Sequence, residues 1–192
     1  MIKHLIKINH LIRKKFGFGI SICPYRASVN FIKNKFQNKE MVCAEIGTFE
    51  GENAEYILKN LNIKKIYLID PWSEYGDYKE KSKTQKNLNK AYTKTLKRLR
   101  KYKDKIVIIK KFSSPAVKDI PNNLDFVYID GNHDYKFVKE DLENYYKKLK
   151  IGGILAGHDI YMPGVSKAFC EFVTKKKLQP YIWPMDFGVI KK

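Results

Sequence analysis

Residues 42–51 read VCAEIGTFEG, an apolar strand that runs directly into an acidic residue and a turn with two glycines. Because glycine has no Cβ, such a turn can leave a strand sharply and bring main-chain N–H groups against a bound molecule. Residues 53–58 then read as a helix, and residues 65–70 as a second strand that ends at Asp70. An acid at that strand end faces the ribose hydroxyls in doubly wound folds. The turn and Asp70 together predict a site for one nucleoside.

The glycine turn departs from the fingerprint of dinucleotide-binding proteins. Only Glu45-x-Gly47-x-x-x-Gly51 is present instead of G-x-G-x-x-G, and no cradle for a pyrophosphate is evident. A nucleoside without phosphates therefore fits the pattern better than a dinucleotide. The alternative interpretation is a tight strand-to-helix turn that binds no ligand.

The rest of the chain alternates between apolar runs and amphipathic segments. Near-continuous apolar runs are typical of strands covered on both faces, and helices between them predict a parallel α/β sheet with right-handed crossovers. A terminal hairpin, residues 180–191, is expected around a Pro-Met-Asp turn. Further strands are expected at residues 106–109, 124–130 and 152–157, and helices at residues 27–36, 88–102, 137–149 and 164–175.

The composition predicts a single folded domain over residues 1–192. Hydrophobic residues make up 44% of the chain and aromatic residues 14%, which argues against disorder. The three cysteines are widely spaced and form no C-x-x-C, so neither a disulfide framework nor a zinc knuckle is indicated. Neither an apolar run of about 18 residues nor a secretory signal is evident. We expect a soluble, cytoplasmic protein with reduced thiols.

The formal net charge of +18 is unevenly distributed. Basic residues concentrate in residues 1–40, which we expect to form a basic helical extension, and in residues 76–111. Such charge can recruit nucleic acid, an anionic membrane or an acidic substrate, whereas the plainer interpretation is a solvated lysine-rich surface. Residues 2–16 are amphipathic, which is typical of a segment that contacts a membrane surface, packs on a partner subunit or caps the core.

A second group of polar residues follows two later strands, as DGNH at residues 130–133 and GHD at residues 157–159. Both lie at the expected ligand-binding edge of the sheet. His133, with an ordinary pKa of about 6.5, is a candidate general base toward a hydroxyl group, together with Asp130 and Asp159. Alternatively, Asp130, His158 and Asp159 bind a divalent metal such as Mg²⁺. Helix capping, or a loop histidine bonded to backbone, is the simpler alternative.

Three sequence blocks carry a resemblance: IDGNHDY at residues 129–135, DL at residues 141–142 and GGILAGHD at residues 152–159. With the glycine turn they resemble a family of small bacterial class I methyltransferases that use S-adenosylmethionine, whose neighbours include macrocin O-methyltransferase and cephalosporin hydroxylase-like proteins. The resemblance covers roughly residues 42–160, the expected cofactor-binding core. It implies a Rossmann-like, mostly parallel seven-stranded sheet of order 3-2-1-4-5-7-6 with helices on both faces.

The resemblance also implies roles for individual residues. The glycine turn would contact the methionine part of the cofactor, Asp70 the ribose and Ser113 the adenine edge, while Asp130 would border the reactive sulfonium. Metal-dependent relatives often place two acids after the fifth strand, where this chain has His158 and Asp159. The expected cofactor-binding residues are Glu45, Gly47, Thr48, Gly51, Asp70, Trp72, Ser113 and Asp130.

We therefore expect O-methylation of a small hydroxylated acceptor, such as a sugar or a secondary metabolite, with Trp72, Tyr75 and Tyr135 as pocket walls. Relatives are often dimers or larger, which implies a homo-oligomer. One rival is an RNA-directed methyltransferase, which the basic surface favours. Amino-directed nucleic-acid methyltransferases usually carry [DNS]-P-P-[YF] after the fourth strand, however, and this chain has DGNH there. The other rival is a Rossmann-like protein that binds a nucleoside without catalysis.

Overall fold

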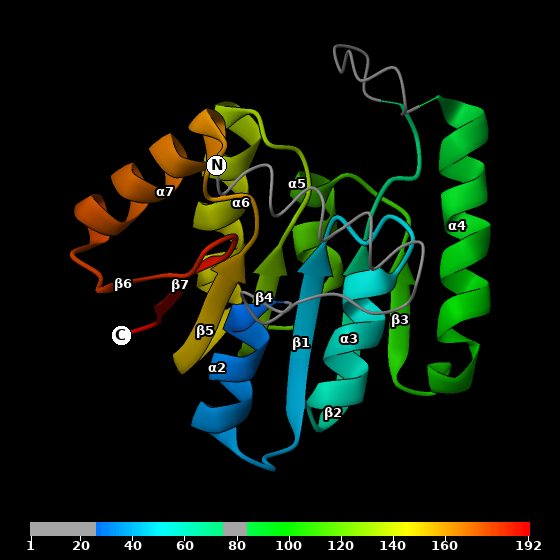
Figure 1. Ribbon diagram of the computed structural model, residues 1–192, viewed down its shortest axis with the longest axis horizontal. Helices are drawn as coiled ribbons and strands as arrows, with labels where there is room; N and C mark the ends of the chain where they lie inside the picture. The colour runs from blue at the N-terminus through cyan, green and yellow to red at the C-terminus, as the bar shows by residue number, and fades with distance from the viewer. Residues whose placement is uncertain (1–25, 75–83) are drawn as a thin grey trace.

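The computed structural model describes residues 26–74 and 84–192. A seven-stranded sheet of order β3-β2-β1-β4-β5-β7-β6 runs through its centre (Figure 1). Strands β1 to β5 are parallel, and β7 pairs antiparallel with both β5 and β6. The strand order that the resemblance implied is confirmed. The strands are β1 (Met41–Ile46), β2 (Ile63–Ile69), β3 (Ile106–Ile109), β4 (Leu124–Ile129), β5 (Leu149–Gly157), β6 (Pro180–Ile182) and β7 (Phe187–Ile190).

Helices cover both faces of this sheet (Figure 1). They are α2 (Ala27–Phe36), α3 (Glu52–Asn60), α4 (Gln85–Leu99), α5 (Ser113–Ala116), α6 (Tyr135–Lys148) and α7 (Pro163–Lys176), with 3₁₀ turns at Arg100–Tyr102 and Val117–Asp119. Strand β4 is buried at every position because it packs on both sides. Phe126 and Tyr128 belong to the core beneath α2 and α3, whereas Val127 and Ile129 belong to the core beneath α6 and α7. Alternate residues of one strand thus join two cores.

Short backbone hydrogen bonds hold the strand-end loops together at the carboxyl edge of the sheet. The Gly47 N–H donates to the Ile69 carbonyl at 2.8 Å, and the Asp130 N–H donates to the Ile46 carbonyl at 2.8 Å. The His158 N–H likewise donates to the Ile129 carbonyl, at 3.1 Å. The loops after β1, β4 and β5 therefore begin in register with their neighbours, which fixes where their side chains start.

Most expected elements agree with the structure, and the differences lie at their ends. The helix expected at residues 27–36 and the strand at 106–109 have those bounds. Strand β5 begins earlier than expected, at Leu149, so α6 ends at Lys148. Helix α7 begins with a proline at its first turn, where the missing N–H costs nothing. The expectations for residues 2–16 and for Tyr75 fall outside the described residues.

None of the helices in the described ranges, 26–74 and 84–192, is long and apolar enough to cross a membrane.

Candidate functional site

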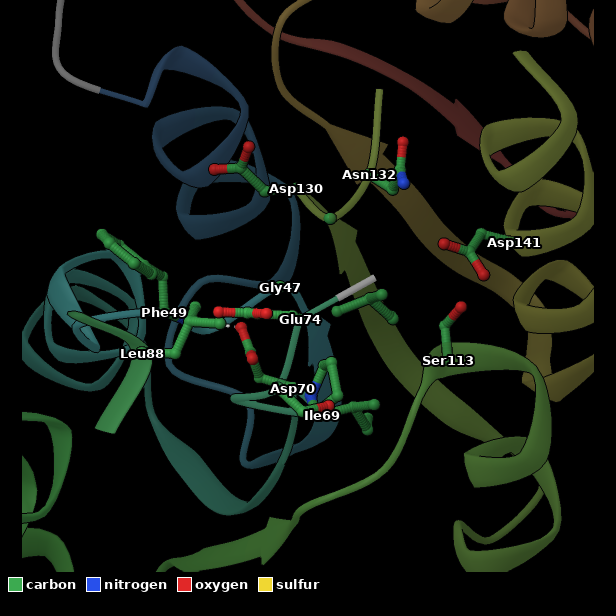
Figure 2. A pocket seen from close by; sticks show the side chains of 14 residues that line it. Gly47, Phe49, Ile69, Asp70, Glu74, Leu88, Ser113, Asp130, Asn132 and Asp141 are labelled. Atoms are coloured by element: carbon green, nitrogen blue, oxygen red, sulfur yellow. Dashed lines mark hydrogen bonds between the residues drawn. The ribbon is translucent and has the colours of Figure 1, made fainter. Parts of the chain in front are cut away.

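A cleft of about 710 Å³, part of it open to solvent, lies at the carboxyl ends of β1, β2 and β4 (Figure 2). It lies at the usual ligand-binding edge of a doubly wound sheet. Of the expected cofactor residues, four line it: Gly47, Asp70, Ser113 and Asp130. The full lining comprises Ile46, Gly47, Phe49, Ile69, Asp70, Pro71, Ser73, Glu74, Leu88, Ser113, Asp130, Gly131, Asn132 and Asp141.

Gly47 lets two loops touch at the floor of the cleft. Its φ is +88°, and a Cβ there would lie 2.1 Å from the carbonyl oxygen of Asp130. Only glycine permits both this conformation and this approach. Gly51 has a different role, because it precedes α3 with φ +74° and packs on Thr95 of α4, away from the cleft lining. The second glycine of the motif therefore shapes the helix start.

Beneath the turn, three buried polar side chains retain unused hydrogen-bonding atoms. Asn53 donates to Oε1 of Glu45 at 2.8 Å. Oε2 of Glu45, Oγ1 of Thr48 and Oδ1 of Asn53 are buried and have no hydrogen-bond partner among the residues that the structure describes. Burial raises the pKa of Glu45 to about 7, although the hydrogen bond from Asn53 partly offsets the rise. Buried polar atoms are normally paired, so these three atoms are exceptions, and none of the three residues is part of the cleft lining.

Asp70, in the wall of the cleft, holds the loops after β1 and β2 together through its carboxylate. Its Oδ2 accepts from the Phe49 N–H at 2.9 Å and its Oδ1 from the Trp72 N–H at 2.7 Å. Phe49 and Trp72 both have positive φ, of 48° and 42°, a conformation that is costly for residues with a side chain. One carboxylate thus stabilises both turns and faces the cleft.

The structure corrects the roles expected for two aromatic residues. Trp72 is fully buried and does not line the cleft; its indole N–H donates to the Phe49 carbonyl at 2.8 Å, and its ring packs on Tyr92. Tyr135 starts α6 and donates to Glu171 of α7 at 2.6 Å, outside the cleft lining. Trp72 therefore supports the Phe49 turn from below, and Tyr135 joins two helices.

The loops after β4 and β5 bring the expected catalytic residues together next to the cleft. Nε2 of His133 lies 3.0 Å from Oδ2 of Asp159 and 3.9 Å from Oδ1 of Asp130. One ligand atom from each of Asp130, His133 and Asp159 falls within 4.8 Å of the others, which is close enough to hold a metal ion. The sequence predicted His158 as the histidine of this metal-binding group, whereas the structure places His133 there. Nδ1 of His158 contacts Asp159 at 3.1 Å, while its Nε2 lies 3.9 Å from Asp186.

The two carboxylates change the chemistry of His133. Although burial opposes it, the hydrogen bonds and negative charges of Asp130 and Asp159 raise the pKa of His133 to about 9. The same contacts keep the pKa values of both carboxyl groups below their usual range despite burial. His133 is therefore protonated at neutral pH in the free site, and the expected pKa of about 6.5 does not hold. A base role requires that this proton be displaced.

Arg26, just before α2, also reaches this group, and no pattern in the sequence indicated that contact. Its Nη2 lies 3.0 Å from Oδ2 of Asp130, and its Nη1 donates to the Tyr128 hydroxyl at 3.0 Å. The Tyr128 hydroxyl donates in turn to Asp186 at 3.1 Å, whose other oxygen accepts from the N–H and hydroxyl of Ser28. Segments from both ends of the chain therefore hold Asp130 in place.

Asn132 and Asp141 line the far end of the cleft with Ser113 (Figure 2), and no role was predicted for either. Both are buried, and burial raises the pKa of Asp141 to about 7. A signal for Asp141 exists in the sequence. It lies among Val138, Leu142 and Tyr145 on the buried stripe of α6, where a helix packed on a sheet normally has apolar residues.

Solved structures share this fold at low sequence identity. An O-methyltransferase from Bacillus cereus, in complex with S-adenosylhomocysteine (SAH), is 10% identical with a TM-score of 0.67, and the match covers 100% of both chains. An rRNA methylase from Streptococcus thermophilus is 16% identical with a TM-score of 0.62, over 88% of this chain and 96% of that one. Proteins that act on unlike acceptors thus share the fold.

Two sequence matches are closer. An uncharacterized protein of Acanthamoeba polyphaga mimivirus is 28% identical over an alignment of 158 residues, and the match covers 78% of this chain and 68% of that protein. Residues 44–160 match a family described as a methyltransferase domain. The match runs from β1 to the loop after β5 and includes every cleft-lining residue. The chain belongs to this family of methyltransferase domains.

Proposed function

We propose that this protein transfers a methyl group from S-adenosylmethionine to a hydroxyl oxygen of a small acceptor. The observation that carries the proposal is the adjacency of two features at one sheet edge. A cleft with a glycine floor and an acid at the end of β2 suits a nucleoside. The group Asp130, His133 and Asp159 borders it and suits the handling of a hydroxyl proton.

The residues present fit this cofactor. The unpartnered oxygens of Glu45 and Thr48 lie beneath the Gly47 turn, where they can accept hydrogen bonds from the ammonium group of a methionine moiety. Asp70 can accept from ribose hydroxyls while still holding the Phe49 and Trp72 turns. When bound, S-adenosylmethionine supplies a methyl group on a positively charged sulfur.

The chain itself has to orient the acceptor, exclude water and remove one proton. His133 would take up the proton of the acceptor hydroxyl as the acceptor oxygen receives the methyl group that the cofactor would supply. Alignment of the reacting groups contributes several kcal/mol, about 7 at the low end of the range for ideal proximity. Asp159 orients the imidazole from 3.0 Å and stabilises it once it is protonated. This order of events requires His133 to start without its proton.

A divalent cation is a second way to activate the acceptor. The donor set of Asp130, His133 and Asp159 is chemically suitable, and an imidazole in the set favours ions such as Mn²⁺ or Zn²⁺ over Mg²⁺. When bound, such an ion would lower the pKa of an acceptor hydroxyl. His133 would then be a ligand instead of the base. The two arrangements differ in whether EDTA abolishes activity.

Calorimetric titration of purified protein with SAH tests the proposal, with separate runs in EDTA and in added Mn²⁺ or Mg²⁺. We expect micromolar binding of SAH. Direct titration with Mn²⁺ tests whether Asp130, His133 and Asp159 bind a metal ion. Asp159→Asn should remove the heat of Mn²⁺ binding while SAH still binds. Lys94→Ala, which breaks an exposed ion pair with Glu50, is the matched surface control. Failure of SAH to bind under all these conditions would refute the proposed cofactor.

A further inference from the structure

The outer face of α4 carries positive charge that no acid of the same helix balances. Residues 84–111, which span α4, the 3₁₀ turn after it and β3, hold eleven lysines and arginines and a single acid, Asp104. Residues 135–176, which span α6, β5 and α7, hold eight basic residues and five acids. Figure 1 shows α4 as the outermost element at one end of the molecule and α7 at the other. Of these two regions, the α4 end therefore carries the larger excess of positive charge.

Four lysines lie along the side of α4, and of the turn after it, that faces away from the protein. They are the lysine row: Lys86, Lys90, Lys97 and Lys101, all exposed. At about 100° per residue, Lys86, Lys90 and Lys97 fall within about 40° of one another and extend over about 17 Å of the helix. The buried residues of α4 lie roughly on the opposite side: Leu88, Ala91, Thr95 and Leu99. The row is therefore the solvent side of an amphipathic helix.

The lysine row is not neutralised by the acids that the structure describes. Lys94 and Arg98 lie on the flank of α4 toward α3, where they pair with acids of that neighbouring segment: Glu50, Glu52 and Glu55. Within residues 26–74 and 84–192, the ion pairs of lysine include none from the lysine row. The flank is thus balanced by opposite charge, whereas the outer face retains its full charge.

The arrangement of the row does not stabilise the helix. Lysines four positions apart, such as Lys86 and Lys90, repel one another. Lys86 also lies in the first turn of α4, where the helix dipole disfavours positive charge, and no acid in that turn offsets it. Exposed lysines at the other end of the molecule are instead paired between α6 and α7: Lys139 with Glu171, and Lys175 with Glu143. The row therefore fits a role in binding an anion better than a role in folding.

We propose that the lysine row binds the phosphodiester backbone of a nucleic acid strand. Lys86 and Lys90 are about 6 Å apart along the helix axis, as are Lys97 and Lys101. Such a straight series of ammonium groups suits a linear polyanion, and contacts to phosphates need no recognition of bases. A membrane surface fits less well, because the apolar residues of α4 are buried in the protein and cannot enter a bilayer.

This inference does not depend on the proposed function. The row belongs to α4 and the turn after it, whereas the residues proposed to handle the hydroxyl proton follow β4 and β5: Asp130, His133 and Asp159. Titration with SAH tests the cofactor, and titration with nucleic acid tests the row. Failure of either experiment leaves the other proposal standing.

The first measurement is fluorescence anisotropy of a labelled single-stranded RNA of about 20 nucleotides, titrated with the full chain over about 50–300 mM KCl. A DNA strand of the same sequence distinguishes the two sources of a phosphodiester backbone. We expect the logarithm of the binding constant to fall with the logarithm of the salt concentration with a slope of about −3 or steeper, as four phosphate contacts require. Absence of binding to both strands at about 50 mM KCl would overturn the inference.

A triple variant assigns the binding to the row. Lys86→Ala, Lys90→Ala and Lys97→Ala together should make the salt slope shallower by about 2 and weaken binding about tenfold or more at about 100 mM KCl. Alanine favours helix, so α4 should still form, which circular dichroism checks. The matched control removes three exposed lysines from α6 and α7: Lys136→Ala, Lys147→Ala and Lys175→Ala. The control should leave the salt slope close to that of the wild type.

Two results with these variants would overturn the inference. An equal loss of affinity in both triple variants would mean that net charge alone attracts the strand. An unchanged salt slope in the folded row variant would mean that the strand binds elsewhere. Sedimentation with vesicles of phosphatidylcholine and phosphatidylserine tests the membrane alternative. Vesicle binding that only the row variant loses, with its nucleic acid binding unchanged, would identify an anionic membrane as the partner and would also overturn the inference.

Discussion

Replacing Gly47 by alanine tests whether the glycine turn is required for contact as well as for conformation. A Cβ at Gly47 would lie 2.1 Å from the carbonyl oxygen of Asp130, 2.5 Å from its carbonyl carbon and 2.6 Å from Cα of Gly131. All three are backbone atoms, so no side chain can rotate aside. The loops after β1 and β4 would have to separate, and the Asp130 N–H bond to Ile46, at 2.8 Å, would be strained.

Gly152 provides a matched control for the conformational part of the effect. Its φ is +75°, close to the +88° of Gly47, but a Cβ there meets nothing within 4 Å. Gly152→Ala therefore incurs only the left-handed penalty, about 1–2 kcal/mol, less a gain of about 0.4–1 kcal/mol from a less flexible unfolded chain. Overpacking adds about 1–3 kcal/mol at Gly47. We expect losses of about 1 kcal/mol for Gly152→Ala and about 2–4 kcal/mol for Gly47→Ala.

Urea unfolding followed by circular dichroism measures both values. The comparison is valid when the two variants and the wild type have the same m value, the slope of the unfolding free energy against urea concentration. Differences between their unfolding midpoints then reflect stability alone. Losses for Gly47→Ala and Gly152→Ala that agree within about 0.5 kcal/mol would refute the argument. The close approach of Gly47 to the Asp130 backbone would then not add to the cost of a side chain at Gly47.

Three further substitutions test other parts of the site. Burial raises the pKa of Glu45 from 4.5 to about 7, so its ionisation destabilises the fold as pH rises across that window, by up to about 3 kcal/mol. In Glu45→Gln the part of this decline that Glu45 causes should be lost, while the part due to Asp141, whose pKa burial also raises to about 7, remains. A loss of stability between pH 5 and pH 8 that is as large in Glu45→Gln as in the wild type, measured by urea unfolding, would contradict this. Trp72→Phe loses the 2.8 Å hydrogen bond to the Phe49 carbonyl. Because Thr95 still donates to that carbonyl, the free energy of unfolding should fall by only about 1 kcal/mol in the same assay. An unchanged free energy of unfolding would exclude a supporting role for Trp72. Arg26→Ala removes the nearest cation from Asp130 and leaves only the two histidines, at 3.8 and 3.9 Å, so it should cost about 3 kcal/mol; a loss no larger than that of an exposed pair, under about 1 kcal/mol, would contradict this.

The sheet and its binding edge could be predicted because their signals are local and redundant. A strand such as β4 is apolar at nearly every position since both faces are covered, and a turn that needs positive φ favours glycine at Gly47. Strand-end acids are then forced to the same edge by parallel topology. For this reason the sequence alone was enough to assign Asp70, Asp130 and Asp159 to that edge.

The partners of these acids could not be predicted in the same way. Asp130 is paired with Arg26, 104 positions away, and Tyr128 with Asp186, 58 positions away. No local pattern marks such pairs, since an arginine before a helix and an aspartate in a hairpin turn read as ordinary surface residues. The raised pKa of His133 has the same origin, because it depends on Asp159 from another loop.

Asp141 shows that a charged residue at a core position of a helix is an informative signal in a sequence. Val138, Asp141, Leu142 and Tyr145 are the buried residues of α6, so a carboxylate occupies a position that helical periodicity assigns to the core. Burying it raises its pKa to about 7, a cost that packing alone does not repay. A charge on the apolar stripe of a helix that starts at the ligand-binding edge is therefore the sequence signal for this cleft-lining residue. By the same reasoning, Lys139 and Glu140, one or two positions away on the exposed side, carry charge without any such implication.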